Sequence, residues 1–209
     1  MEMNRLMGWI YQFCRWITTL AYINILWITF TLIGIVFLGF FPATVAMFTV
    51  VKKLVIGETN IPISKTFWQS YRTEFWKINC LGFILLLIGI ILYVDLAIFS
   101  NREHFIYLVH RVGLIAIFLI FMVFCMFIFP IYTHFDLKFS QYFKRTFAII
   151  FLVPIRSLGM ILSAIGLYFV MLKLPGLILF FSGSVLSFVC TWIAYKAILS
   201  LQYRYEETL

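Results

Sequence analysis

Apolar residues fill long runs along the chain, and only short polar segments separate these runs. Most of the runs reach the ~20 residues that an α-helix needs to cross a bilayer, and they are too long for core strands. The pattern therefore predicts an all-α fold, a polytopic bundle of transmembrane helices. The predicted spans are Ile17–Leu38, Pro42–Ile56, Cys80–Ser100, Arg111–Pro130, a segment between Phe147 and Leu172, and Leu174–Leu199.

The stretch GFFPATVAMFTVVKK, Gly39–Lys53, decides whether the chain crosses the membrane six times or five. We interpret Gly39, Phe41 and Pro42 as a tight outer turn; the apolar run before them is longer than a signal peptide requires. The run Pro42–Ile56 has 15 residues. It reaches roughly 22 Å, short of a ~30 Å hydrocarbon core. A full crossing then needs lysine snorkelling or local thinning, and a re-entrant half-helix is the alternative.

The positions of lysine and arginine favour six crossings with both termini in the cytoplasm. With an outer turn at Pro42, most basic residues face inside, and only Arg102, Arg111 and Lys173 face outside. Without that crossing, the best orientation places Arg5 and Arg15 on the outer face. The excess of positive charge on cytoplasmic loops therefore supports six spans.

Three amphipathic segments are predicted to lie at the inner membrane surface as short helices. They are the first sixteen residues, Ser64–Asn79 and Asp136–Phe147. The last two share a spacing of phenylalanine, glutamine and basic residues, and each directly precedes a span. This order predicts a single membrane domain, 1–209, with a parallel pseudo-repeat of 42–100 and 111–172; convergent composition is the alternative.

Composition adds little to this picture beyond excluding other classes of protein. The 209 residues are 64% hydrophobic and 11% charged, which leaves no room for a separate soluble domain. The net charge of +8 sits beside apolar runs, so we expect anionic lipid headgroups rather than nucleic acid as its counterpart. No Walker loop, serine elbow or metal-ligand spacing appears, so we expect no enzyme activity, cofactor or metal.

Three polar residues within the predicted spans are candidates for function, because such residues are costly in a bilayer. Asp95 lies late in its span, where an interfacial carboxylate paired with Arg102 is the alternative to an ion site. Arg156 is interpreted as an anchor at the inner interface. Asn24 is expected to form a hydrogen bond between helices.

Residues 24–79 carry a recognisable combination of short motifs. These are Gly34 and Gly39, Phe41-Pro42-Ala43-Thr44, the Lys52-Lys53 pair, Gly57-Glu58, Thr66-Phe67-Trp68 and Phe75-Trp76-Lys77. With them the chain resembles the YesL-like family of bacterial integral membrane proteins, a domain of unknown function. The resemblance implies a bacterial cell membrane and a context beside carbohydrate ABC importers that take up plant oligosaccharides. It implies no catalytic residues.

We therefore expect an accessory membrane subunit of a carbohydrate ABC importer, whose partners are the permease subunits and, through its inner surface, the ATPase. The aromatic and basic side chains of Ser64–Asn79 are the expected contact surface. One alternative is an independent small transporter or channel, against which the scarcity of buried polar residues counts. Another is a lipid-binding scaffold. The predicted contact residues are Phe67, Trp68, Tyr71, Arg72, Phe75, Trp76 and Lys77.

Overall fold

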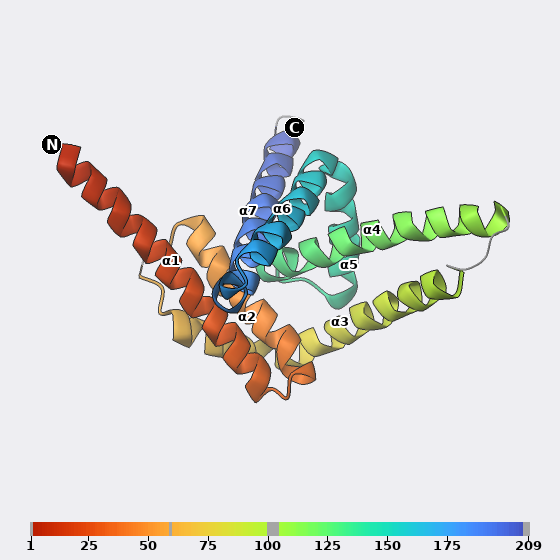
Figure 1. Cartoon of the computed structure of the whole chain (residues 1–209), viewed down its shortest axis with the longest axis horizontal. Coiled ribbons are helices and arrows are strands. Elements are labelled where there is room, and N and C mark those ends of the chain that lie inside the picture. Colours follow the sequence, from red (N-terminus) through yellow and green to blue (C-terminus); the bar gives the residue numbers. More distant parts are fainter. Residues whose placement is uncertain (1, 59, 100–104, 207–209) are drawn as a thin grey trace.

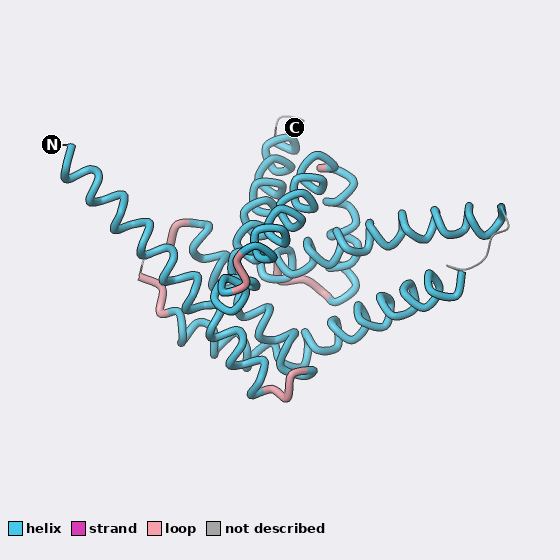
Figure 2. Tube along the Cα trace, viewed as in Figure 1, coloured by secondary structure: helices cyan, strands magenta, loops and turns pink. Residues whose placement is uncertain are grey.

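Every element that the computed structural model describes is a helix (Figures 1 and 2). The structure describes the backbone of residues 2–58, 60–99 and 105–206, and the side chains of residues 11–58, 60–99 and 105–202. Arg102 and the side chains of the first ten residues therefore lie outside the described residues. The helices are α1 (Glu2–Ile33), α2 (Phe37–Ile56), α3 (Ile63–Phe99), α4 (Phe105–His134), α5 (Phe139–Leu152), α6 (Pro154–Lys173) and α7 (Gly176–Glu206).

Six of the described helices are long and apolar enough to cross a membrane, as the apolar runs predicted. The shortest of them have 20 residues, which correspond to about 30 Å of helix. Only α5, with 14 residues, falls short. The fold is therefore a multi-pass helix bundle of six spans. The alternative of five spans assumed that the second apolar run is too short to cross, and α2 has the required length.

The turn between the first two spans lies at Gly34–Val36, so the prediction of a turn at Gly39, Phe41 and Pro42 is wrong. Here Val36 N donates to Thr31 O at 3.0 Å and Gly34 N donates to Phe30 O at 3.1 Å. Pro42 is a buried residue inside α2. The loss of its amide is tolerated because Asn79 Nδ2 of α3 donates to Leu38 O at 3.0 Å. That carbonyl is the one a residue at position 42 would normally bond.

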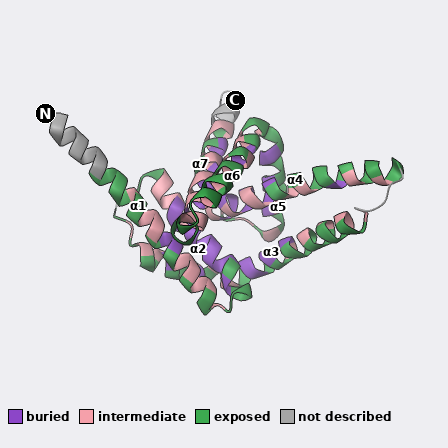
Figure 3. Ribbon diagram, in the orientation of Figure 1, coloured by how far each residue is buried: buried purple, intermediate pink, exposed green. Residues whose placement is uncertain are grey.

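Helix α2 forms the centre of the bundle and packs against α1, α3, α4 and α7 (Figure 3). Its buried face is rich in small and β-branched residues, which allow neighbouring helices to approach closely. Because the helix begins at Phe37, it is five residues longer than the predicted span at its start. The fully buried members of this face include Ala43, Val45, Ala46, Val50 and Val51.

Two of the three predicted surface helices are continuous with a span, which corrects the expectation of separate helices. Ser64–Asn79 is the first part of α3, since no helix-breaking residue separates it from the span that follows. Residues 2–16 of the first predicted surface helix likewise run on into the rest of α1. Only the third segment forms a helix of its own, α5. Pro154 then starts α6, with Val153 between the two helices. The pseudo-repeat stays a prediction.

The outer halves of α3 and α4 extend together away from the rest of the bundle, at the right of Figure 1. Asp95 of α3 lies in this arm, with its Oδ1 3.6 Å from His110 Nε2 of α4. The inner ends of the same two helices converge on α2, and the functional candidate lies there.

Candidate functional site, a polar cavity between α2, α3 and α4

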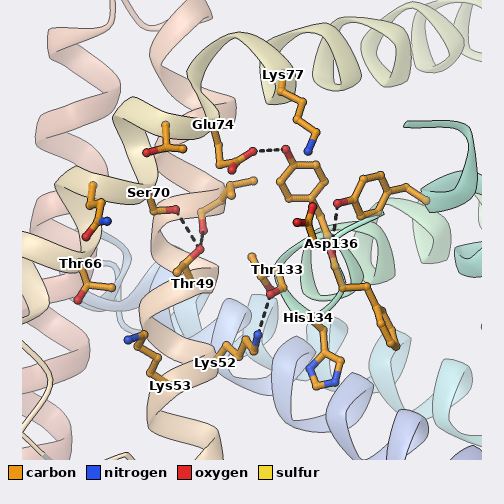
Figure 4. A pocket seen from close by; sticks show the side chains of 16 residues that line it. Thr49, Lys52, Lys53, Thr66, Ser70, Glu74, Lys77, Thr133, His134 and Asp136 are labelled. Atoms are coloured by element: carbon orange, nitrogen blue, oxygen red, sulfur yellow. Dashed lines mark hydrogen bonds between the residues drawn. The ribbon is translucent and has the colours of Figure 1, made fainter. Parts of the chain in front are cut away.

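A cavity of about 540 Å³ lies where the last turns of α2 meet the first part of α3 and the end of α4. Figure 4 shows its side chains, which point inward from these helices and from the connection that follows α4. Most of them are polar, in a chain that is 64% hydrophobic. The cavity is lined by Val45, Thr49, Lys52, Lys53, Thr66, Gln69, Ser70, Thr73, Glu74, Lys77, Tyr132, Thr133, His134, Phe135, Asp136 and Tyr142.

The cavity forms because polar stripes on two helices face each other. On α3 the polar residues recur at three- and four-residue spacing, which places them on one face of a helix. On α2 the lining positions also follow a helical period. Thr49 Oγ1 and Ser70 Oγ lie 3.0 Å apart and join the two stripes by a hydrogen bond. The α3 stripe consists of Thr66, Gln69, Ser70, Thr73, Glu74 and Lys77.

The end of α4 closes the cavity with tyrosine and backbone groups. Tyr132, which is buried, donates its hydroxyl to Glu74 Oε2 at 2.5 Å. Such charge-assisted hydrogen bonds are among the stronger ones in proteins. Only one oxygen of the Glu74 carboxylate is used in this contact, so the other remains able to accept a hydrogen bond from a ligand.

Three lysines reach the cavity, and two of them lack a carboxylate partner among the described residues. Lys52 Nζ donates to the carbonyl oxygen of Thr133 at 2.8 Å. Lys77 Nζ lies 5.7 Å from the centre of the Tyr132 ring. Lys53, by contrast, pairs with Glu58 outside the cavity at 3.4 Å. An ammonium group has three donors, so Lys52 and Lys77 both keep donors for a ligand.

A tyrosine fixes the connection that carries Asp136. Tyr142 of α5 is buried, and its hydroxyl donates to Phe135 O at 3.1 Å. The same hydroxyl accepts a hydrogen bond from Leu137 N at 3.1 Å. These two contacts hold the backbone on both sides of Asp136, which places its carboxylate at the cavity wall opposite α2.

Comparisons with known proteins assign the family. A family model described as "Protein of unknown function, DUF624" matches residues 20–96. The chain is 37% identical to "Uncharacterized protein YteU" of Bacillus subtilis (strain 168), over 97% of this chain and 90% of that protein. It is 35% identical to "Uncharacterized protein YesL" of the same bacterium, over 94% of this chain and 92% of that protein.

The chain belongs to the YesL-like family. "Uncharacterized protein YesV" of the same bacterium is a more distant relative, 26% identical over 90% of each chain. No solved structure matches. The similarity extends over nearly the whole chain, beyond the third that carries the motifs. In this YesL-like protein the matched residues 20–96 include both polar stripes of the cavity.

The predicted contact residues on α3 do not form one surface. Phe67 and Tyr71 are buried against Phe30 of α1, with ring centres 5.2 and 5.1 Å from that of Phe30. They are therefore core residues, which corrects their prediction as partner contacts. Phe75 is half-buried. The remaining four side chains lie in two places. Lys77 lines the cavity, whereas Trp68, Arg72 and Trp76 are exposed outside it.

The three polar candidates within the spans of the YesL-like protein are not among the residues that line the cavity. Asn24 is fully buried and bonds α7: its Nδ2 donates to Leu179 O at 2.8 Å, and its Oδ1 accepts from Gly183 N at 2.9 Å. The expected hydrogen bond between helices is thus confirmed. Asp95 contacts His110, as described above. Arg156 lies in the first turn of α6, and its Nη1 is buried without a hydrogen-bond partner.

The cavity itself was not predicted from the sequence. The sequence shows Lys65, Gln69, Arg72, Glu74 and Lys77 as the polar side of an amphipathic helix. Such a face normally points to water or headgroups. What turns it into a cavity is Tyr132, which is 58 residues away from Glu74 along the chain. No local pattern carries that information.

Proposed function

We propose that this protein is an accessory subunit of a carbohydrate ABC importer in a bacterial cell membrane, without enzyme activity of its own. The resemblance to the YesL-like family supplies the importer context. Six apolar helices support a role within the membrane. In this role the protein binds the permease and aids its assembly or coupling, and both of its termini face the cytoplasm.

The observation that carries this proposal is the exposed aromatic surface of α3, formed by Trp68, Arg72 and Trp76. Trp76 is 81% exposed and Trp68 is 48% exposed, whereas the neighbouring Phe67 and Tyr71 are buried. Tryptophan and arginine are the residue types that most often dominate the binding energy of protein interfaces. This surface lies on the first part of α3, which the proposed topology places at the cytoplasmic side, where a permease or its ATPase is accessible.

A pull-down tests this surface. The double variant Trp68→Ala, Trp76→Ala is expected to weaken binding to the permease by at least roughly 30-fold, since a single interface tryptophan can contribute about 2 kcal/mol. A tagged copy would be purified in mild detergent from its native host grown on plant polysaccharide, and bound proteins quantified by mass spectrometry. Trp192→Ala is the matched control, because Trp192 is 45% exposed on α7.

The outcomes separate the roles. A permease recovered at near-equal amount with the wild type, and lost only with the α3 variant, supports the proposal. Recovery of the protein alone, from cells that express a permease, contradicts it. A variant that keeps the permease but co-purifies with less anionic lipid than the wild type would instead indicate a lipid-binding scaffold.

An independent transporter is the second candidate, and the cavity favours it. A path for a polar solute needs hydrogen-bonding side chains, and the cavity provides them between three spans. Purified protein in liposomes would be tested for uptake of labelled oligosaccharide without any ABC partner. Uptake above that of protein-free liposomes favours the transporter, and no uptake favours the accessory subunit.

The proposed topology has a test of its own. Alkaline phosphatase, which is active only outside the cytoplasm, is expected to be active when fused in the connection between α3 and α4. It is expected to be inactive when fused in the connection between α4 and α5, because Lys138, Lys144 and Arg145 follow there. The reverse pattern of activity would overturn the proposed orientation.

A further inference from the structure

The polar cavity combines groups of both charges that are not paired with each other. Lys52 and Lys77 have no carboxylate within 4.0 Å among the described residues, and Glu74 bonds only the Tyr132 hydroxyl. Asp136 comes from the connection that follows α4 (Figure 4). A hollow into which several polar groups converge without pairing with one another is the usual place for a polar ligand to bind.

The mixture of donors and acceptors discriminates between classes of ligand. A phosphate group carries negative charge, so Lys52 and Lys77 would attract it, whereas Glu74 and Asp136 would repel it. A sugar hydroxyl both donates and accepts hydrogen bonds. Such hydroxyls can therefore pair with the lysine ammonium groups, with the carboxylates and with the Gln69 amide, all of which line the cavity. The cavity thus matches a polyhydroxylated group better than an anion.

The size and the opening of the cavity suit a small molecule of this kind. Its volume of about 540 Å³ lies within the ~300–1,000 Å³ of typical ligand sites. Gln69, Thr73 and Lys77 are exposed and border its mouth, whereas Tyr132 and Tyr142 are buried and form its floor. A ligand can enter from the side of these exposed residues and contact the Glu74 carboxylate at depth.

We propose that this cavity binds a polyhydroxylated group, either a free mono- or disaccharide or the sugar headgroup of a glycolipid. Glu74 and Asp136 accept hydrogen bonds from its hydroxyls, and Lys52 and Lys77 donate to its oxygens. This inference goes beyond the importer role. It concerns the purified protein alone, so it holds or fails independently of whether a permease binds α3.

Binding to the full-length protein in nanodiscs tests the inference. The free probes are glucose, maltose and sucrose, measured by saturation-transfer NMR, and inorganic phosphate, measured by equilibrium dialysis. A diglucosyl diacylglycerol in the nanodisc tests the lipid source. Lys77→Met is expected to weaken sugar binding by about tenfold or more, as is Glu74→Gln, because both remove charge-assisted hydrogen bonds. Lys65→Met is the matched control, since Lys65 is exposed on α3 outside the cavity.

The outcomes are distinct. Binding of a free sugar that Lys77→Met and Glu74→Gln weaken, with Lys65→Met within twofold of wild type, supports a saccharide site. The same pattern with the glycolipid alone supports the headgroup source. Binding of phosphate in place of all sugars overturns the inference, as does sugar binding that neither cavity variant changes. The melting temperature of each variant checks that it is folded, and Lys77, being exposed, is the variant least able to disturb the fold.

Discussion

Replacing Gly39 with alanine is expected to destabilise the protein by about 3 kcal/mol, the upper range of typical overpacking effects. A Cβ atom at Gly39 would lie 2.5 Å from Thr31 O and 2.8 Å from Gly34 Cα. At Gly34 it would lie 2.3 Å from Gly39 Cα. These three atoms belong to the backbone, so rotation of a side chain cannot relieve the clash. Because neither glycine has a side chain, the backbone at the start of α2 can pack directly against the end of α1 and the turn between them.

The chain offers a matched control for this prediction. A Cβ atom at Gly159, in the middle of α6, meets nothing within 4 Å. Alanine there is expected to leave the protein as stable or slightly more stable, since glycine is the poorer helix former. Thermal unfolding in detergent would compare the variants. Equal melting temperatures for Gly39→Ala and Gly159→Ala would contradict the close contact of α1 and α2.

The bundle could be predicted from sequence because span length and hydropathy are local properties. The turn at Gly34–Val36 could not be predicted, because proline is the more visible helix breaker. Pro42 led to a predicted turn that begins at Gly39, five residues after Gly34. Pro42 is accommodated in α2 only by the contact from Asn79. Helix α3 is continuous because no helix-breaking residue lies within it. The sequence pattern changes from amphipathic to apolar at Asn79, and this change suggested two separate helices.

The candidate site depends on packing to a greater degree than the fold. Lys77 was predicted to belong to a partner-contact surface at the inner face of the membrane, and it lies in the cavity with residues that no motif connects. In the sequence, Glu74 and Asp136 look like ordinary polar residues of amphipathic segments; the structure places Glu74 inside α3 and Asp136 in the connection between α4 and α5. Their significance comes from the position of α4, whose Tyr132 reaches Glu74, and from Tyr142, which fixes the connection beside Asp136. Such distant pairings are set by the whole bundle.

A second large effect is expected at Asn79. The variant Asn79→Leu leaves Leu38 O without the donor that it receives at 3.0 Å. Because Pro42 has no amide hydrogen, α2 cannot supply a replacement. An unsatisfied carbonyl in an apolar environment costs about 1–3 kcal/mol, so the melting temperature is expected to fall clearly.

The decisive measurement is the double variant Asn79→Leu, Pro42→Ala. Alanine at position 42 restores a backbone N–H that can donate to Leu38 O within α2. The loss caused by Asn79→Leu is therefore expected to be smaller by about 1 kcal/mol or more in the Pro42→Ala background than in the wild type. Strictly additive effects would show that Asn79 acts through another contact, such as its bond to Phe75 O. Coupling of the expected sign would show that the proline within α2 is stable because a side chain from α3 performs the task of its missing amide.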